Sequence, residues 1–355
     1  MSKHVQEKTN QSQVPSQIQE QFQEQSKTQE QFQEPILRGP MRRVTLPIPK
    51  ERKPIWDAYK RQFSNIWPAE HFTFSKDLYD WNNKLNANER YFILQVLAFF
   101  AESDALVNAN LLERFQQEVQ YLEAQYVYGV QMMMENVHSE TYANAAQTFE
   151  PDAGKLEKLF KSAELIPCIR RKKEYAERWI NSADDFAVRL VAFAIFEGVF
   201  FSGSFCAIYW LKDRGLMGEL CASNEAISKD EGEHTKFACL LFNNYIIKKP
   251  SQEKIHEMFQ GAVAIEKEFI IDSIPCPMLG MNADKMSQYI EYVADRLLTA
   301  LGYDRIWNVT CPFSFMSKIS ADSIDNFFDK QATTYSIANV GFEGDNVYGD
   351  SDEDW

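Results

Sequence analysis

Apolar residues recur every three or four positions from Trp56 onward, in long stretches that Pro, Gly and Asn interrupt. This spacing is typical of amphipathic α-helices, whereas the alternating pattern of β-strands is almost absent. The sequence therefore predicts an all-α body. We expect helices over residues 88–118, 120–149, 152–165, 170–181, 184–213, 218–247, 252–273 and 283–301, with Pro167, Gly215, Pro250 and Pro275 as the stops.

The two ends of the chain lack this pattern. Residues 1–40 are rich in Gln, Glu and Ser and contain the sequence QEQFQE twice. Such a composition buries too little apolar surface to offset the entropy lost on ordering. After residue 328 the helical spacing ends, and the chain finishes in the acidic run GDNVYGDSDEDW. We therefore predict a disordered tail over residues 1–40, one helical domain over 41–328 and a flexible acidic tail over 329–355.

One predicted helix contains a segment long enough to cross a membrane, VAFAIFEGVFFSGSFCAIYWL at residues 191–211. Glu197 lies in the middle of it, and an ionisable group there is costly in lipid. A helix that is apolar on all sides can also form the centre of a large bundle. We therefore expect a buried helix and no membrane. The N-terminal sequence has no apolar segment typical of a secretory signal, so the expected location is cytoplasmic.

Charge and cysteine content narrow the functional classes. The chain has 37 basic and 51 acidic residues, a formal net charge of −14. Phosphate binding needs concentrated positive charge, so nucleic acid is not an expected partner. The six cysteines are scattered without a C-x-x-C pair, which predicts buried, reduced thiols in place of disulfides or a thiolate metal site.

Three Glu-x-x-His motifs occur in the chain. A carboxylate and an imidazole three residues apart lie on one face of a helix, so such a motif can offer two ligands to one site. The first two motifs begin at Glu135 and Glu231 in long apolar helices. The third, Glu253 to His256, starts a helix among charged residues, and we interpret it as a solvated surface pair.

Each of the two apolar motifs follows a helix that carries one acid in an apolar stretch. Asp104 precedes Glu135 by 31 positions, and Glu197 precedes Glu231 by 34. Two helix hairpins of this kind would project four carboxylates and two imidazoles into one bundle, the layout of dinuclear carboxylate sites. Few Lys or Arg residues lie in the surrounding stretches, so two divalent ions are needed to balance the buried charge. The predicted metal ligands are Asp104, Glu135, His138, Glu197, Glu231 and His234.

The ligand types also restrict the metal. Oxygen-rich ligation with imidazole and without thiolate favours iron, with manganese as the second choice. Asp230 points about a quarter turn away from Glu231, so it could accept a hydrogen bond from a ligand imidazole or could be a surface residue. Tyr142 follows His138 by four positions on the same face. A phenol there could lose an electron and a proton to the metal pair, or be an ordinary core tyrosine.

Several long segments, in order, resemble the small subunit of class I ribonucleotide reductase of the eukaryotic type. They are FFAESDALVNANLLERF, MMMENVHSETY, FEGVFFSGSFCAIYWLKDRGL, NEAISKDEGEHTKFACLLF and MNADKMSQYIEYVADRLL. The similarity runs from about Trp56 to Tyr335. It implies a homodimeric, ferritin-like subunit whose di-iron centre reacts with oxygen to form a stable tyrosyl radical on Tyr142. The radical would then serve a large subunit that reduces ribonucleoside diphosphates.

The resemblance also implies roles that the residue pattern alone does not. Trp67, Asp230 and His138 would form an internal radical relay, and Tyr335 would continue it in the tail. The acidic, aromatic end DSDEDW is similar to the peptide that docks into the large subunit. Two positions depart from the family: Trp355 stands where Phe is usual, which bears on partner fit, and Lys229 stands where Arg is expected, which bears on hydrogen bonding near the relay.

Two other functions share parts of this pattern. A di-iron oxidase or ferroxidase that acts without a partner would use the same six ligands, but it gives no role to Trp67, Tyr335 or the acidic end. A non-enzymatic paralogue that only regulates assembly with the large subunit would bind no metal, and the intact ligand set argues against it.

Overall fold

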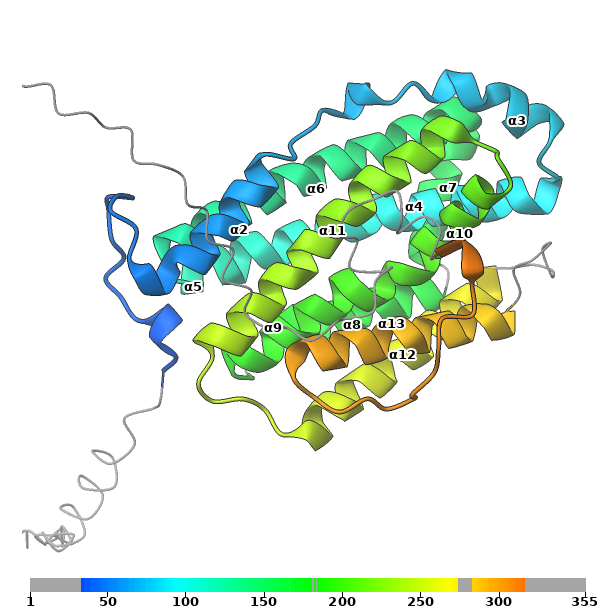
Figure 1. Ribbon diagram of the computed structural model, residues 1–355. Coiled ribbons are helices and arrows are strands. Elements are labelled where there is room, and N and C mark those ends of the chain that lie inside the picture. The colour runs from blue at the N-terminus through cyan, green and yellow to red at the C-terminus, as the bar shows by residue number, and fades with distance from the viewer. Residues whose placement is uncertain (1–32, 166, 181, 183, 274–282, 317–355) are drawn as a thin grey trace, which may run out of the picture.

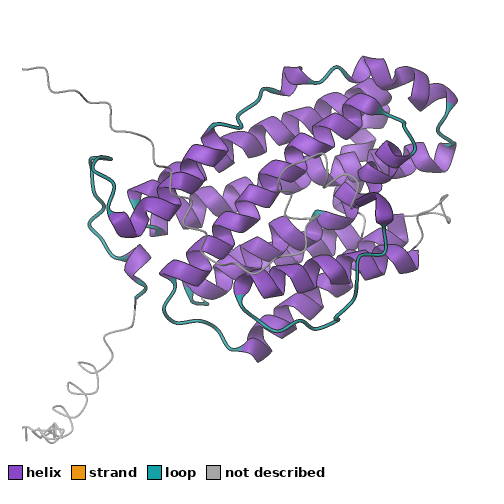
Figure 2. Ribbon diagram, in the orientation of Figure 1, coloured by secondary structure: helices purple, strands orange, loops and turns teal. Residues whose placement is uncertain are grey.

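The computed structural model describes residues 33–165, 167–180, 182, 184–273 and 283–316 (Figure 1). Within these ranges every regular element is a helix, as Figure 2 shows, so the predicted all-α class is confirmed.

Four long helical segments form the centre of the molecule. Figure 1 shows α6 and α11 running along the length of the bundle, with α4 and the α9–α10 segment in the same body. A π-helical turn over Phe196–Phe200 joins α9 to α10. The four segments are α4 (Ala87–Asn110), α6 (Leu122–Phe149), α9 with α10 (Phe186–Ile195 and Ser202–Asp213) and α11 (Gly218–Tyr245).

Local sequence signals fix the ends of these helices. The Asn86 side chain accepts a hydrogen bond from the Glu89 backbone N–H at 3.0 Å, and the Glu89 carboxylate accepts one from the Asn86 N–H at 2.9 Å. This reciprocal capping box starts α4. After α10, Gly215 has a φ of 66°, a conformation that glycine adopts without a Cβ clash and that ends the helix.

The remaining helices surround this centre. Among them, α2 lies on α6 and α11, while α12 and α13 pack on each other and on the π-helical turn. Their bounds are α2 (Lys53–Phe63), α3 (Leu78–Asn83), α5 (Gln116–Glu118), α7 (Ala153–Leu165), α8 (Pro167–Ile180), α12 (Gln252–Ser273) and α13 (Ala283–Leu301).

All eight predicted helices occur, with three differences. The predicted helix 88–118 contains a π-helical turn at Leu111–Phe115, and 184–213 contains the turn at Phe196–Phe200. Pro167 begins α8, where its missing N–H is not needed, and does not act as the predicted stop. The sequence predicted neither α2 nor α3. Pro275 lies outside the described residues.

Residues 33–40 are described and pack on the bundle, although they belong to the segment predicted to be a tail. Ile36 is fully buried, and the Glu34 carboxylate accepts hydrogen bonds from the N–H groups of Ile247 and Lys248 at 2.8 and 2.9 Å. Further along, Arg42 and Arg52 form ion pairs with the fully buried Glu123 on α6. These contacts fasten the N-terminal segment to the bundle.

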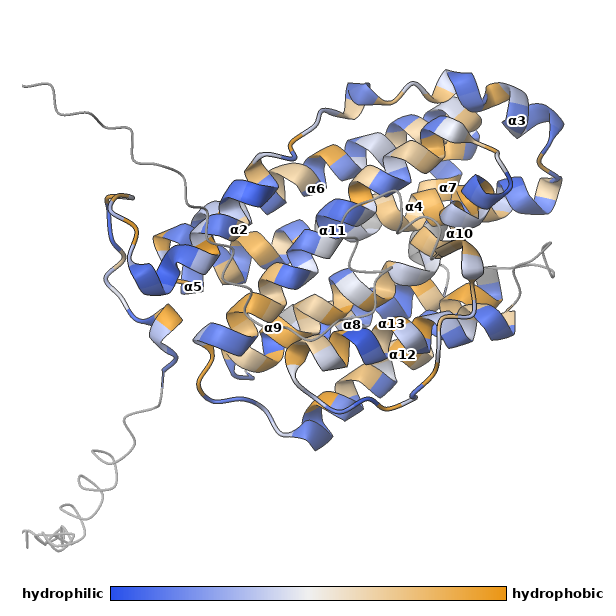
Figure 3. Cartoon of the chain, in the orientation of Figure 1, coloured by the Kyte–Doolittle hydropathy of each residue, from blue (hydrophilic) through white to orange (hydrophobic). Residues whose placement is uncertain are grey.

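The apolar segment over Phe186–Asp213 forms part of the protein core. Its composition and length would suit a membrane, but its most apolar window is entirely buried by protein. Figure 3 shows apolar residues dominating α9 where it faces its neighbours. The described cysteines are free thiols: Cys168, Cys206, Cys221 and Cys239 are buried and Cys311 is partly exposed, while Cys276 lies outside the described residues.

Asp295 on α13 holds the loop that follows this helix. Its buried carboxylate accepts hydrogen bonds from the N–H groups of Ile306, Trp307 and Asn308 at 2.8, 3.1 and 2.6 Å. Replacing Asp295 by Ala leaves these donors without their partner, so we expect the free energy of unfolding to fall by about 3 kcal/mol. Chemical denaturation of the metal-free chain measures it. The exposed Asp304 in the same loop is the control, and equal stability of Asp295→Ala and Asp304→Ala would contradict the assignment.

Candidate metal centre

The fold brings all six predicted ligands into the interior of the bundle. One acid comes from α4 and one from the π-helical turn, while α6 and α11 each contribute a carboxylate and an imidazole. Each of the six residues is at most 1% exposed. They are Asp104, Glu135, His138, Glu197, Glu231 and His234.

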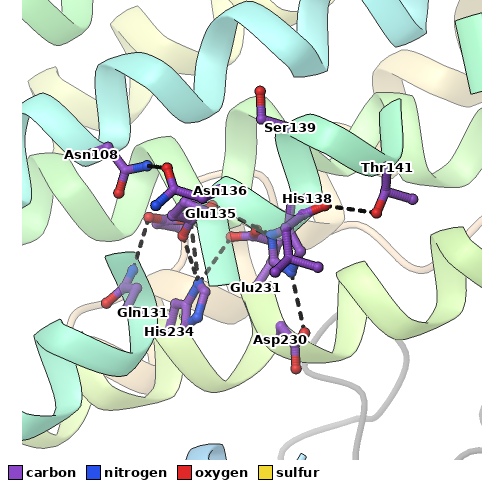
Figure 4. Close-up of polar contacts among 12 residues, drawn as sticks. Asn108, Gln131, Glu135, Asn136, His138, Ser139, Thr141, Asp230, Glu231 and His234 are labelled. Carbon is purple, nitrogen blue, oxygen red and sulfur yellow. Dashed lines mark hydrogen bonds and ion pairs between the residues drawn. The ribbon is translucent and has the colours of Figure 1, made fainter. Parts of the chain in front are cut away.

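Four of these residues form the tightest group. Glu135, Glu197, Glu231 and His234 each offer one ligand atom, and these atoms all lie within 4.8 Å of one another. His234 Nδ1 is 3.1 Å from Glu135 Oε1 and 3.3 Å from Glu231 Oε2 (Figure 4). A single cation could contact all four side chains at this point.

His138 extends the group to a second position. Its Nδ1 lies 3.0 Å from Glu231 Oε1 and 3.4 Å from Glu135 Oε2. Glu135 and Glu231 therefore each direct one oxygen towards His138 and the other towards His234. The two imidazole centres are 6.2 Å apart. Carboxylates that face two nitrogen ligands in this way are suited to bridging two cations.

Glu197 and Asp104 lie at the edges of the group. Glu197 Oε1 accepts a hydrogen bond from Gln131 Nε2 at 3.2 Å, and its Oε2 is 4.0 Å from His234 Nδ1. Gln131 was not predicted from the sequence, although this residue precedes Glu135 by four positions and so shares its helical face. Burial, followed by the charge of Glu135, raises the pKa of Asp104 well above its usual value.

The donor set fits a pair of cations. Six buried atoms have no hydrogen-bond partner: Asp104 Oδ2, both Glu135 oxygens, Glu197 Oε2, Glu231 Oε1 and His138 Nδ1. In the described part of the chain, no Lys or Arg forms an ion pair with these carboxylates. Buried charges without partners are costly, so the arrangement calls for positive charge at the position where the orphaned atoms meet.

In the metal-free chain, protonated imidazoles supply part of this positive charge. Burial lowers the pKa of His234, but Glu231 and Glu135 outweigh burial and raise it to about 10. Burial lowers the pKa of His138 as well, but the nearby carboxylates of Asp230, Glu135 and Glu231 outweigh burial and raise it well above its usual value. Protons therefore occupy the imidazoles at neutral pH, and a metal ion must displace them.

Asp230 lies on the opposite side of His138 from the carboxylates. Its Oδ2 is 3.2 Å from His138 Nε2 and accepts a hydrogen bond from Trp67 Nε1 at 2.9 Å. The Trp67 ring stacks on the imidazole with centres 5.7 Å apart and planes 24° apart. A hydrogen bond from Nε2 to Asp230 leaves Nδ1 free to bind a cation. Trp67, Asp230 and His138 thus form a continuous chain from a half-buried indole to the metal group.

Lys229, which stands where Arg is expected, contacts the segment that precedes Trp67. Lys229 Nζ donates a hydrogen bond to Asn65 Oδ1 at 3.2 Å. One turn further along α11, Glu233 Oε2 accepts from Arg61 Nε at 3.3 Å. The exposed face of α11 therefore fastens the chain just before Trp67.

Tyr142 lies among aromatic side chains next to the metal group. It is 3% exposed and stacks on Phe100, with ring centres 4.5 Å apart and planes 7° apart. The ring centre of Phe100 in turn lies 5.5 Å from that of Phe201 and 5.0 Å from that of Phe205. Burial, followed by the charge of Asp104, raises the pKa of Tyr142 well above its usual value. Phe100 was not predicted from the sequence, although this residue precedes Asp104 by one helical turn.

The other predicted positions lie elsewhere. Tyr335 and Trp355 are outside the described residues. The third motif is at the surface, where Glu253 is exposed and His256 Nε2 donates a hydrogen bond to the Asp304 carbonyl at 2.9 Å.

The chain matches the family described as ribonucleotide reductase, small chain, over residues 45–312. A ribonucleoside-diphosphate reductase small chain of Neurospora crassa is 52% identical over 309 residues, which cover 86% of this chain and 75% of the relative. Small chain 1 of Saccharomyces cerevisiae is 50% identical over 308 residues, covering 86% of this chain and 77% of the relative.

Solved structures agree with these sequence matches. The ribonucleotide reductase Rnr4 homodimer of Saccharomyces cerevisiae is similar with a TM-score of 0.74 and 36% identity, covering 86% of this chain and 98% of that one. The dimanganese(II)-NrdF of Streptococcus sanguinis has a TM-score of 0.66 at 15% identity over 81% of this chain and 98% of that one, which shows a shared fold. The predicted ferritin-like bundle is confirmed. The chain belongs to the ribonucleotide reductase small-chain family, as a small subunit of ribonucleoside-diphosphate reductase, an oxidoreductase.

Proposed function

We propose that this subunit binds two iron ions with its six buried ligands and uses them with dioxygen to form a radical on Tyr142. The radical then serves a large subunit that reduces ribonucleoside diphosphates to deoxyribonucleoside diphosphates. The observation that carries the proposal is the placement of Glu135 and Glu231, each with one oxygen towards His138 and one towards His234. Iron fits the oxygen and imidazole donors, and manganese is the alternative.

Two bound ferrous ions would supply two of the four electrons that reduce dioxygen to water, the phenol of Tyr142 would supply the third, and an external one-electron reductant would supply the fourth. Asp104 is the charged group with the largest effect on the pKa of Tyr142, and its Oδ2 has no hydrogen-bond partner. This carboxylate can take the phenol proton when Tyr142 loses an electron. The rings of Phe100, Phe201 and Phe205 keep water and reductants away from the phenoxyl that remains.

The chain of Trp67, Asp230 and His138 supports a relay between the metal group and the surface. Asp230 Oδ2 accepts the Trp67 Nε1 proton in a hydrogen bond and can hold that proton when the indole gives up an electron. In this proposal Tyr335 continues the relay and the acidic C-terminal tail docks into the large subunit; both rest on the family resemblance.

The organisation of the chain follows the same proposal. Residues 1–40 form a tail whose last part packs on the body, 41–328 form the metal-binding domain and 329–355 form the docking tail. The subunit acts as a homodimer in the cytoplasm, and the solved Rnr4 homodimer supports the dimer. The net charge of −14 argues against nucleic acid as a partner.

Replacing Tyr142 by Phe tests the site of the radical. Phe keeps the stacking on Phe100 but cannot lose a phenol proton, so the variant should bind iron normally and show no tyrosyl signal in electron paramagnetic resonance. The matched control is Tyr128→Phe, because Tyr128 is also buried on α6 and its hydroxyl has no hydrogen-bond partner. A tyrosyl signal that persists in Tyr142→Phe, or disappears in the control, would contradict the assignment.

Replacing Trp67 by Phe tests the relay. The change removes the donor to Asp230 and leaves the six ligands in place, so iron content and the tyrosyl signal should be retained. Nucleotide reduction with the large subunit should fall to background. Trp56→Phe is the control, because Trp56 on α2 is partly buried among aromatic rings away from Asp230. Normal reduction by Trp67→Phe would contradict the relay role of Trp67.

Metal binding should depend on pH. The raised pKa of His234, about 10, means that its imidazole is protonated below that pH in the metal-free chain. Each imidazole must lose its proton to bind a cation, so affinity for Mn²⁺ should rise from pH 6 to 8 with release of protons. Calorimetric titration in buffers of different ionisation enthalpy measures this release. Binding without proton release would contradict the proposed ligands. The control variant His256→Ala should leave the Mn²⁺ affinity and the proton release unchanged.

A further inference from the structure

A buried ion pair lies next to the π-helical turn, outside the metal group. Lys172 on α8 forms an ion pair with Glu266 on α12, and the two side chains are 1% and 0% exposed. Lys172 Nζ also lies 3.8 and 3.7 Å from the ring centres of Phe99 and Phe269. Neither member of this pair has a place in the proposed chemistry.

Lys172 reaches the turn that carries Glu197. Its Nζ donates a hydrogen bond of 3.0 Å to the carbonyl oxygen of Phe200, the last residue of the π-helical turn. A π-helical turn interrupts the ordinary helical ladder, so carbonyl groups there depend on other donors. The neighbouring Val199 carbonyl accepts from the Ser202 hydroxyl at 2.7 Å. Side-chain donors therefore satisfy two successive carbonyls at the end of the turn.

Glu266 is held in turn by a close approach of α12 to α10. A Cβ on Gly203 would lie 2.7 Å from Glu266 Oε1 and 2.8 Å from Ile270 Cδ1, so only glycine leaves room for this carboxylate. Gly203, Glu266 and Lys172 thus form a connected series from the backbone of α10 to the Phe200 carbonyl.

The pair is poorly suited to a purely stabilising role. Burial lowers the pKa of Lys172 to about 8, although Glu266 opposes it, and burial raises the pKa of Glu266 to about 7, although Lys172 opposes it. Both shifts show that removal from water outweighs the attraction between the two charges. Buried ion pairs are often no more stable than apolar residues of similar volume.

Glu197 is the ligand that most needs such support. Its Oε1 accepts a hydrogen bond from Gln131, its Oε2 has no hydrogen-bond partner, and it lies farther from His234 than Glu135 and Glu231 do. The position of its carboxylate therefore depends on the backbone of the π-helical turn.

We propose that Lys172 is a positioning residue, which holds the Phe200 carbonyl and so keeps the π-helical turn in the form that presents Glu197 to the metal ions. Glu266 keeps the Lys172 amine in place. The inference rests on the proposed dinuclear site.

Two variants separate the hydrogen bond from the ion pair. Glu266→Gln removes the carboxylate charge and keeps the Lys172 amine as a donor to Phe200. The double variant Lys172→Met with Glu266→Gln also removes this donor, with a side chain of comparable length. Mn²⁺ binding by the full-length chain, followed by paramagnetic resonance of free Mn²⁺, compares the two variants. Melting temperatures of the metal-free proteins report on stability separately.

We expect Glu266→Gln to bind two Mn²⁺ ions as the unmodified chain does. The double variant should melt close to Glu266→Gln but bind at least one ion about tenfold or more weakly, the usual effect of losing a group that orients a ligand. A crystal structure of the double variant should show the Glu197 carboxylate displaced from Gln131. Equal Mn²⁺ affinity of the two variants would overturn the role of Lys172.

Failure of the dinuclear site itself gives a different result, because the unmodified chain would then bind fewer than two ions. If the double variant does not fold, Lys172→Met alone is compared with the unmodified chain at pH 6, where Glu266 is protonated and needs no partner. The same loss of affinity is expected there, and its absence would overturn the inference.

Discussion

The mutual repulsion of four buried carboxylates is the constraint on which the centre of this bundle depends. Asp104, Glu135, Glu197 and Glu231 lie together in the interior, and in the described part of the chain no Lys or Arg neutralises them. Leaving such charges unpaired would cost several kcal/mol or so for each ion. Two divalent cations meet this need directly, and protonated imidazoles meet it partly in their absence.

The same constraint links the metal group to the rest of the fold. His138 presents one nitrogen to the carboxylates and the other to Asp230, so the residue that helps to hold the charge also connects it to Trp67. The π-helical turn carries Glu197, and Lys172 donates a hydrogen bond to the carbonyl of the last residue of that turn. In the proposed function, metal binding, the relay and the positioning of Glu197 use contiguous contacts around one buried cluster.

The sequence predicted the features that depend on helical periodicity. Long apolar helices and Glu-x-x-His spacing place ligands on one face, and the offset of Asp230 from Glu231 agrees with its contact to the far side of His138. The contacts of Gln131 and Phe100 also lie on these faces and were within reach of the same argument. The short helix α2, KPIWDAYKRQF, was not predicted, although its apolar residues recur at helical spacing.

Other features depend on which helices pack together and so could not be predicted from periodicity. At the π-helical turn that carries Glu197, Lys172 from α8 donates to the Phe200 carbonyl, and α12 approaches α10 closely at Gly203. Trp67 meets Asp230 across 163 positions of sequence. Long-range contacts of this kind are fixed by tertiary packing, and only the family resemblance indicated the role of Trp67.

The most direct test of the central claim is a crystal structure of the iron-loaded chain with anomalous scattering measured at the iron absorption edge. The account predicts two separate anomalous peaks, one beside His138 and one beside His234, with the carboxylates of Glu135 and Glu231 between them. A single peak, or none, within this cluster would contradict it.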